Sequence, residues 1–164
     1  LRFSDDIQLW CRAMIAKCYI NHPKYRNKIN HYTHIKVQGI QQGHLKYFIA
    51  LQRLEVVFLE GNIGWLQELP NLNELRISHL KVSDPSPLYH IPSLTKLSII
   101  EFFCPPIDIQ KFKHLQDIDI VKNPIKECPS LESFANLRNL SLSRSSITTT
   151  KRFITEDGRA IKNN

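Results

Sequence analysis

Residues able to bind a metal gather in the first part of this sequence. Zinc accepts thiolate and imidazole ligands, but structural zinc sites usually bring their ligands in pairs two to four residues apart. Only His31 and His34 have that spacing. Cys11 and Cys18 are seven residues apart, which places both on the apolar face of a predicted helix as small core residues. We therefore expect no metal site from the candidate residues Cys11, Cys18, His22, His31 and His34.

Residues arranged for catalysis are also sparse. The chain has five glycines in all, and it contains neither a phosphate-cradling loop nor a nucleophile motif. Asp117 and Asp119 alternate along one predicted strand and are the nearest approach to a catalytic carboxylate pair. Their simpler interpretation is the solvated side of that strand. We expect a protein that is not an enzyme and carries no cofactor.

Composition favours one domain. The chain has 164 residues, 42% of them hydrophobic, which suffices for one sizeable core. The net charge is +7 with a pI near 9.3, but residues 1–31 contribute +4 and residues 148–164 contribute +2. The stretch between them is therefore almost neutral.

The sequence contains neither an apolar run long enough to span a bilayer nor the pattern of a signal peptide. The four cysteines form no C-x-x-C pair, so reduced thiols are expected. These features predict a cytoplasmic protein. Because the chain begins at Leu1, a fragment of a longer protein or a removed signal is also compatible with it.

The elements that must position any site come from a repeat. Apolar residues recur at steps of three, three, three and two in five segments, from "LKYFIALQRLEV" to "LESFANLRNLSL". Such regular spacing indicates a solenoid, in which each unit stacks on its neighbours to bury a shared core. The anchor leucines are Leu51, Leu72, Leu94, Leu115 and Leu137, at intervals of 21, 22, 21 and 22 residues.

Each unit is expected to contain a short 3₁₀ segment and a short strand. The steps of three fit the 3₁₀ segment, and the L-x-L step fits a strand whose alternate residues point inward. Cys104 and Cys128 occupy inward positions and are predicted to be buried thiols. A shorter sixth unit is indicated at Tyr32, where Ile35 and Val37 repeat the strand step. The strands are expected near 53–57, 74–78, 96–100, 117–121 and 139–143, with Leu75, Ile77, Leu97, Ile99, Ile118, Ile120, Leu140 and Leu142 inward.

These units resemble leucine-rich repeats, whose core is L-x-x-L-x-L-x-x-N-x-L. The segment "LQDIDIVKNPI" (115–125) matches that core if Ile stands for Leu, and "LRNLSLSRSSI" (137–147) departs from it only at Ser145. The period is similar to that of the short class shared by internalins and the leucine-rich regulatory subunit of protein phosphatase 1. The resemblance implies an α/β solenoid that is curved, with short parallel strands on its concave face.

The chain departs from this family at the Asn position, whose side chain normally ties adjacent turns together. A single asparagine cannot form a ladder, so we expect apolar packing to hold the middle turns. The residues at this position are Leu59, Leu80, Phe102, Asn123 and Ser145.

Three regions follow from this pattern. Residues 1–31 are predicted to form an N-terminal capping helix, begun by Ser4 and ended near Pro23, and a connector. Residues 32–150 hold five to six leucine-rich repeats. Residues 151–164 have no strand signature and are expected to be a C-terminal cap or tail.

The candidate site is the outward side of the strands, which lines the concave face of such a solenoid. Counted from each anchor leucine, the third and fifth positions are mostly charged, and the seventh and eighth carry apolar residues that point away from the core. Exposed apolar area tends to mark an interaction site, and charged neighbours set orientation. The predicted partner-binding residues are Arg53, Glu55, Val57, Phe58, Glu74, Arg76, Lys96, Ile100, Asp117, Asp119 and Val121.

The hypothesis from sequence is a scaffold or adaptor that binds a protein partner. The outward apolar residues are also compatible with plain strand propensity, self-association or burial under a tail. Two further functions stand beside the first: binding of nucleic acid or an acidic surface by the basic ends, notably residues 24–36, and recognition within a larger enzyme or a secreted bacterial effector. The sequence predicts no membrane span and leaves the oligomeric state open. Nucleic acid is not the expected partner.

Overall fold

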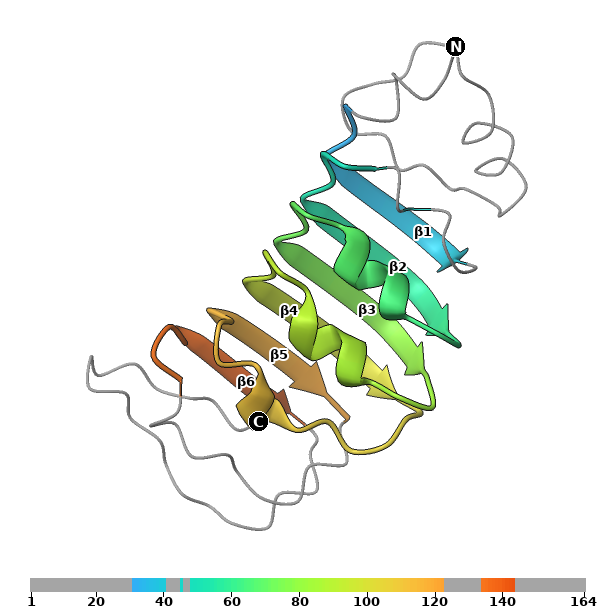
Figure 1. Cartoon of the computed structure of the whole chain (residues 1–164). Helices are drawn as coiled ribbons and strands as arrows, with labels where there is room; N and C mark the ends of the chain where they lie inside the picture. The colour runs from blue at the N-terminus through green and yellow to red at the C-terminus, as the bar shows by residue number, and fades with distance from the viewer. Residues whose placement is uncertain (1–30, 41–44, 46–47, 123–133, 144–164) are drawn as a thin grey trace.

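The computed structural model describes residues 31–40, 45, 48–122 and 134–143. Within these residues the chain forms one open sheet in which every strand pairs in parallel with the next along the chain (Figure 1). This confirms the predicted solenoid of parallel strands. The strands are β1 (His34–Ile40), β2 (Arg53–Glu60), β3 (Glu74–Lys81), β4 (Lys96–Phe102), β5 (Asp117–Val121) and β6 (Asn139–Ser143).

The strand positions agree closely with the repeat. β2 to β6 begin at the expected residues, and β1 confirms the strand of the sixth unit. β2, β3 and β4 run past their expected ends because the pairing continues through Phe58, His79 and Glu101.

Short 3₁₀ helices return the chain along one side of the sheet (Figure 1). They are η1 (Gly64–Glu68), η2 (Ser86–His90) and η3 (Ile109–Lys111). At the start of each 3₁₀ helix, a side-chain oxygen accepts a hydrogen bond from the backbone N–H of the residue two positions later. Asn62 accepts from Gly64 at 2.8 Å, Asp84 from Ser86 at 2.9 Å and Asp108 from Gln110 at 3.1 Å. These bonds satisfy N–H groups that a helix start leaves without partners.

The core lies between the sheet and the 3₁₀ helices. All eight residues predicted to point inward from the strands are buried, and so are four of the five anchor leucines, while Leu137 is partly buried against them. The alternation along each strand therefore sets its two sides as expected. The opposite side of the sheet, which carries the third, fifth, seventh and eighth positions, is called the strand face below.

The Asn position is apolar and packed, as expected. Leu59 and Leu80 are fully buried, and Phe102 is partly buried against the core. Asn123 and Ser145 lie outside the described residues. Burial of these side chains replaces the family's amide ladder at the ends of β2 to β4.

A different polar ladder lies at the start of the strands. One backbone carbonyl of each unit accepts two N–H groups of the next; Gln52, for example, accepts from Asn73 and Glu74, both at 2.9 Å. Side chains add to it. Asn71 donates to the Ile49 carbonyl at 2.7 Å, and Ser93 donates to the Pro70 carbonyl at 2.5 Å. The side-chain hydrogen bonds of Asn71 and Ser93 to neighbouring repeats thus lie near the strand starts, while backbone hydrogen bonds such as Phe103 N–H to the Leu80 carbonyl continue at the strand ends.

One prediction on burial is wrong. Cys104 is a free thiol that is only partly buried, because it follows the end of β4 and no longer alternates into the core. Partial burial still raises the pKa of Cys104 to about 11. Residues 1–30, which hold the predicted capping helix with Cys11 and Cys18, lie outside the described residues, as do Cys128 and the region 151–164. Among the residues described, no helix is long and apolar enough to cross a membrane.

Candidate partner-binding face

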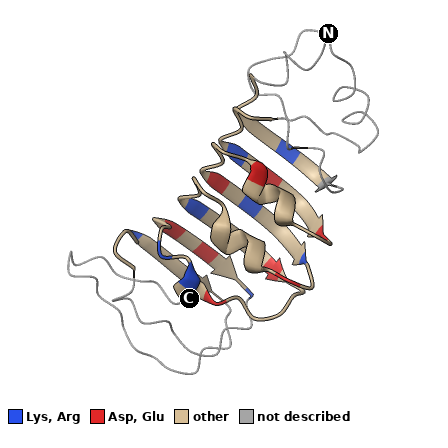
Figure 2. Cartoon of the chain, in the orientation of Figure 1, with Lys and Arg blue, Asp and Glu red and all other residues tan. Residues whose placement is uncertain are grey.

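Strand pairing lines up the predicted charged residues in two columns across the strand face. The third-position column runs His34, Arg53, Glu74, Lys96, Asp117, Asn139, and the fifth-position column runs Lys36, Glu55, Arg76, Ser98, Asp119, Ser141. From β2 to β5 the sign of the charge alternates along the first column, as Figure 2 shows in blue and red. Opposite charges on neighbouring strands are within reach of each other.

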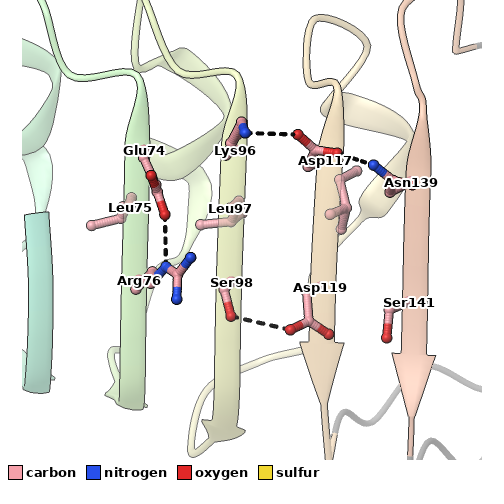
Figure 3. Close-up of a pocket in the computed structure, with 11 residues that line it drawn as sticks. Glu74, Leu75, Arg76, Lys96, Leu97, Ser98, Asp117, Asp119, Asn139 and Ser141 are labelled. Carbon is pink, nitrogen blue, oxygen red and sulfur yellow. Dashed lines mark hydrogen bonds and ion pairs between the residues drawn. The ribbon is translucent and has the colours of Figure 1, made fainter. Parts of the chain in front are cut away.

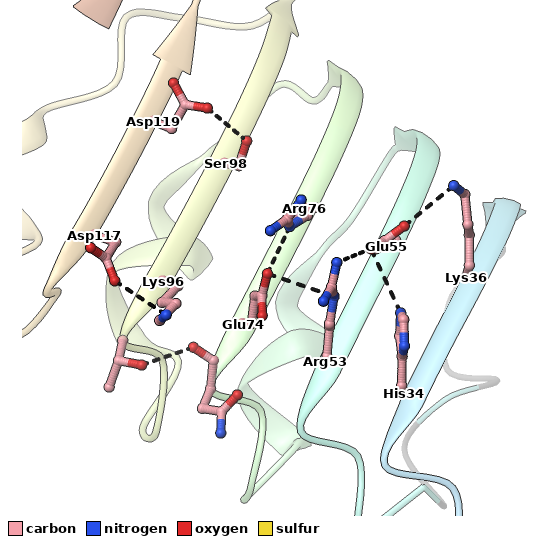
Figure 4. A network of polar contacts seen from close by, with 12 residues as sticks. His34, Lys36, Arg53, Glu55, Glu74, Arg76, Lys96, Ser98, Asp117 and Asp119 are labelled. Atoms are coloured by element: carbon pink, nitrogen blue, oxygen red, sulfur yellow. Dashed lines mark hydrogen bonds and ion pairs between the residues drawn. The ribbon is translucent and has the colours of Figure 1, made fainter. Parts of the chain in front are cut away.

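Two glutamates form the ion pairs on the half of the strand face over β1 to β3 (Figure 4). Glu55 lies 3.4 Å from Lys36, 2.5 Å from Arg53 and 3.6 Å from His34. Glu74 lies 2.7 Å from Arg76 and 3.6 Å from Arg53. Partial burial alone would raise the pKa of Glu55, but the hydrogen bonds and charges of Arg53 and Lys36 outweigh it and hold that pKa below its ordinary value.

The other half, over β3 to β6, contains a shallow hollow of about 300 Å³ (Figure 3). Lys96 lies 3.5 Å from Asp117, which also accepts a hydrogen bond from the Asn139 amide. Ser98 donates to Asp119 at 3.3 Å. The two aspartates therefore have separate partners. The hollow is open to solvent, and Leu75, Leu97 and Ile118 line it together with the polar side chains.

The charges of the two columns sum to zero when histidine is neutral. Lys36, Arg53, Arg76 and Lys96 balance Glu55, Glu74, Asp117 and Asp119. Exposed ion pairs of this kind are each worth about 0–1 kcal/mol, so the network contributes little to the free energy of unfolding.

The apolar part of the strand face lies toward the strand ends. Phe58 is 45% exposed and Ile100 is 44% exposed, while Val57 and Val121 are partly exposed. In β2 two successive residues, Val57 and Phe58, lie between the inward-pointing Val56 and Leu59, so both reach the outward side. The predicted outward orientation of the seventh and eighth positions is thus observed.

A row of side chains that sequence reasoning missed crosses this apolar region. The ring of Phe58 stacks on His79 with centroids 4.7 Å apart. His79 Nδ1 lies 2.8 Å from Glu101, and Glu101 pairs with Lys122. Contacts with Lys122, opposed by partial desolvation and aided by His79, keep the pKa of Glu101 below its ordinary value. These residues could have been found from the sequence, because Phe58, His79, Glu101 and Lys122 all occupy the eighth position of their repeats.

The side chains that could bind a metal do not lie close together in the described part of the chain. No group of three or more His, Cys, Asp or Glu side chains there could hold a metal ion. His34 is committed to the Glu55 network. Cys11, Cys18 and His22 lie outside the described residues.

Solved structures similar to this one include two internalins from Listeria monocytogenes. Internalin InlF is 20% identical, with 77% of this chain and 39% of that chain covered and a TM-score of 0.56. Internalin C2 is 15% identical, with 82% and 84% covered and a TM-score of 0.41. No protein-family model and no curated protein matches this chain. The chain thus spans about two fifths of the length of internalin InlF, and it shares with that protein the fold of a leucine-rich-repeat solenoid.

Proposed function

We propose that this chain is a non-catalytic protein-interaction module that binds a protein partner on its strand face. The observation that carries the proposal is the exposure of Phe58 and Ile100 on an otherwise well-packed sheet. Large apolar side chains left in water beside fixed charges are typical of interaction surfaces. A leucine-rich-repeat fold supplies the rigid surface, and the residues exposed on it supply specificity.

The strand face suits a protein better than a nucleic acid. Its charged columns are neutral in sum, whereas a phosphate-binding surface needs an excess of Lys and Arg. Charged side chains such as Lys81 and Lys122 are exposed toward the strand ends, together with the apolar side chains of Phe58 and Ile100. A protein partner can desolvate the apolar side chains in the centre of an interface, with the ion pairs around them as its polar rim.

The test is partner capture by the intact chain and two matched variants. Ile100→Asp/Val121→Asp should weaken capture at least about thirtyfold, because central apolar anchors contribute about 2 kcal/mol or more each. Its melting curve should stay close to that of the wild type, since exposed substitutions usually change stability by less than about 0.5 kcal/mol. Lys24→Glu/Arg26→Glu/Lys28→Glu should capture the same partner normally.

The reverse pattern would contradict the proposal. If the apolar double variant binds normally and the charge-reversal variant does not, the basic N-terminal segment is the binding site. If the double variant unfolds, the two side chains are part of the core and the strand face is not available to a partner.

A further inference from the structure

Asp119 differs from every other charged residue of the two columns. Within the described chain, the other seven Lys, Arg, Asp and Glu side chains of these columns each have an ion pair. Asp119 has none, and the 3.3 Å hydrogen bond from Ser98 is its side-chain contact. The carboxylate is also exposed. It can therefore accept further hydrogen bonds from outside the chain.

The surroundings of Asp119 favour a cation. In its column the flanking residues on β4 and β6 are Ser98 and Ser141, which bring no positive charge. Lys96, in the other column, is occupied by Asp117. Over β4 to β6 the columns hold two carboxylates and one ammonium, so this half of the strand face carries a net charge of −1. These residues line the hollow described above together with the paired Glu74 and Arg76 of β3, and the hollow gives a side chain room to reach Asp119 (Figure 3).

Apolar area lies next to this carboxylate. Val121 is two residues further along β5, about 7 Å away at roughly 3.3–3.4 Å per residue. Ile99 pairs with Ile120, which sets the exposed Ile100 beside Val121. An acceptor for positive charge and an apolar platform therefore stand side by side, with both aimed outward.

We propose that the protein partner of the strand face inserts a Lys or Arg side chain into the hollow, where it pairs with Asp119. A neighbouring apolar residue of the partner rests on Ile100 and Val121. This inference rests on the proposed function and adds the chemistry of the partner. The paired charges elsewhere on the strand face are already satisfied, so Asp119 is the residue that selects for a basic partner. An arginine fits best, because its several N–H donors can reach the carboxylate and the Ser98 and Ser141 hydroxyls together.

The test is a selection of 12-residue peptides from a random displayed library against the full chain. The selected peptides should be enriched in Lys or Arg with an apolar residue close by. For the strongest of them, Asp119→Asn should weaken binding about tenfold, the coupling expected of a close charge pair in an interface. Asn keeps the shape of the side chain, so the folded structure should be unaffected.

A double-mutant cycle separates the ion pair from other effects. Replacing the key arginine of the peptide by citrulline, which has the same shape without the charge, should weaken binding to the wild type about tenfold and binding to Asp119→Asn hardly at all. Peptides that show no basic enrichment, or that bind Asp119→Asn as well as the wild type, overturn the inference.

The variant Ile100→Asp/Val121→Asp distinguishes this failure from a failure of the proposed function. Peptides that ignore Asp119 but lose binding to the apolar double variant overturn the basic-partner inference and support the strand face as a binding site. Peptides that bind both variants normally, or a selection that yields no binder to the wild type, count against both proposals.

Discussion

Two isoleucines on neighbouring strands show how one residue type serves two purposes in this chain. Ile118 of β5 is 1% exposed in the core, and Ile100 of β4 is 44% exposed on the strand face. Each follows from the alternation along its own strand. Burial stabilises the fold at one site, and exposure leaves apolar area for a partner at the other.

The pair gives a matched prediction at this scale. Ile118→Ala should lower the free energy of unfolding by about 2–5 kcal/mol, because core contacts are lost and a cavity remains. Ile100→Ala should change it by less than about 0.5 kcal/mol. Urea denaturation of both variants measures the difference. Equal effects at the two positions would mean that the assignment of inward and outward sides is wrong.

Glu55 predicts a dependence on pH. Its pKa is lower in the folded chain than the ordinary value of 4.5, so the folded state favours the carboxylate. The stability contributed by Glu55 is then fully present above that value and is lost as the pH falls through the lowered pKa. Wild type should exceed Glu55→Gln in free energy of unfolding by about 1 kcal/mol or less near pH 7. The gap should close as the pH falls below 4.5 and through the lowered pKa of Glu55.

A control for this titration is Glu60→Gln. Glu60 lies 3.8 Å from Lys81, and both side chains are largely exposed. Its substitution should change the free energy of unfolding near pH 7 by less than about 0.5 kcal/mol. A gap between wild type and Glu55→Gln that stays constant from neutral to acidic pH would show that the ion pairs of Glu55 do not stabilise the folded chain.

At the scale of elements, the junctions between repeats determine how the strands are held. The family's Asn position is filled by fully buried Leu59 and Leu80, and their packing replaces side-chain hydrogen bonds at the strand ends. At the strand starts, shared carbonyls and side chains such as Asn71 supply the hydrogen bonds between neighbouring units. Each of these junctions thus combines apolar packing of the former Asn position with shared hydrogen bonds at the strand starts.

This division predicts that restoring the family residue is harmful. Leu80→Asn should lower the free energy of unfolding by about 3 kcal/mol or more, since apolar burial is lost and an amide is left between apolar neighbours. Leu80→Met keeps the volume and should cost less than about 1.5 kcal/mol. Thermal or urea unfolding measures both. A stable Leu80→Asn variant would show that this position can hold an amide ladder after all.

At the scale of the molecule, most of the positive charge and the proposed binding surface belong to different stretches of the sequence. Residues 1–31 and 148–164 carry most of the net charge of +7, while the columns of the strand face sum to zero. Charge of the whole chain therefore says little about what the strand face binds. Protein binding and nucleic-acid binding, two of the functions considered from sequence, are therefore assigned to different stretches of the chain.

Salt dependence distinguishes the two functions. Between about 50 and 200 mM salt, capture of a protein partner should weaken by less than about tenfold, because few net charges are neutralised on the strand face. Binding of a labelled DNA duplex, if driven by 6–10 phosphate contacts, would weaken by about 10³–10⁵ over the same range. Titrations of both ligands at several salt concentrations measure the slopes. A steep slope for the protein partner would assign its binding to the basic ends.

The sequence by itself determined the repeat, the strand positions and the two sides of the sheet. These depend on local spacing, since alternate residues of a strand face opposite ways and anchor leucines every 21 or 22 residues must stack. For this reason Ile118 could be assigned to the core and Ile100 to the surface from the sequence. The burial of Cys104 was misjudged because it lies just beyond β4, where that alternation no longer holds.

The tertiary structure decided which outward residues meet. Phe58 and His79 are 21 positions apart, and their stacking depends on the register between β2 and β3. The same register pairs Lys96 with Asp117 and leaves Asp119 without an ion pair within the described chain. These contacts depend on the length and the rotamer of side chains on neighbouring strands. The spacing of residues along the chain does not determine the rotamers or which side chains meet.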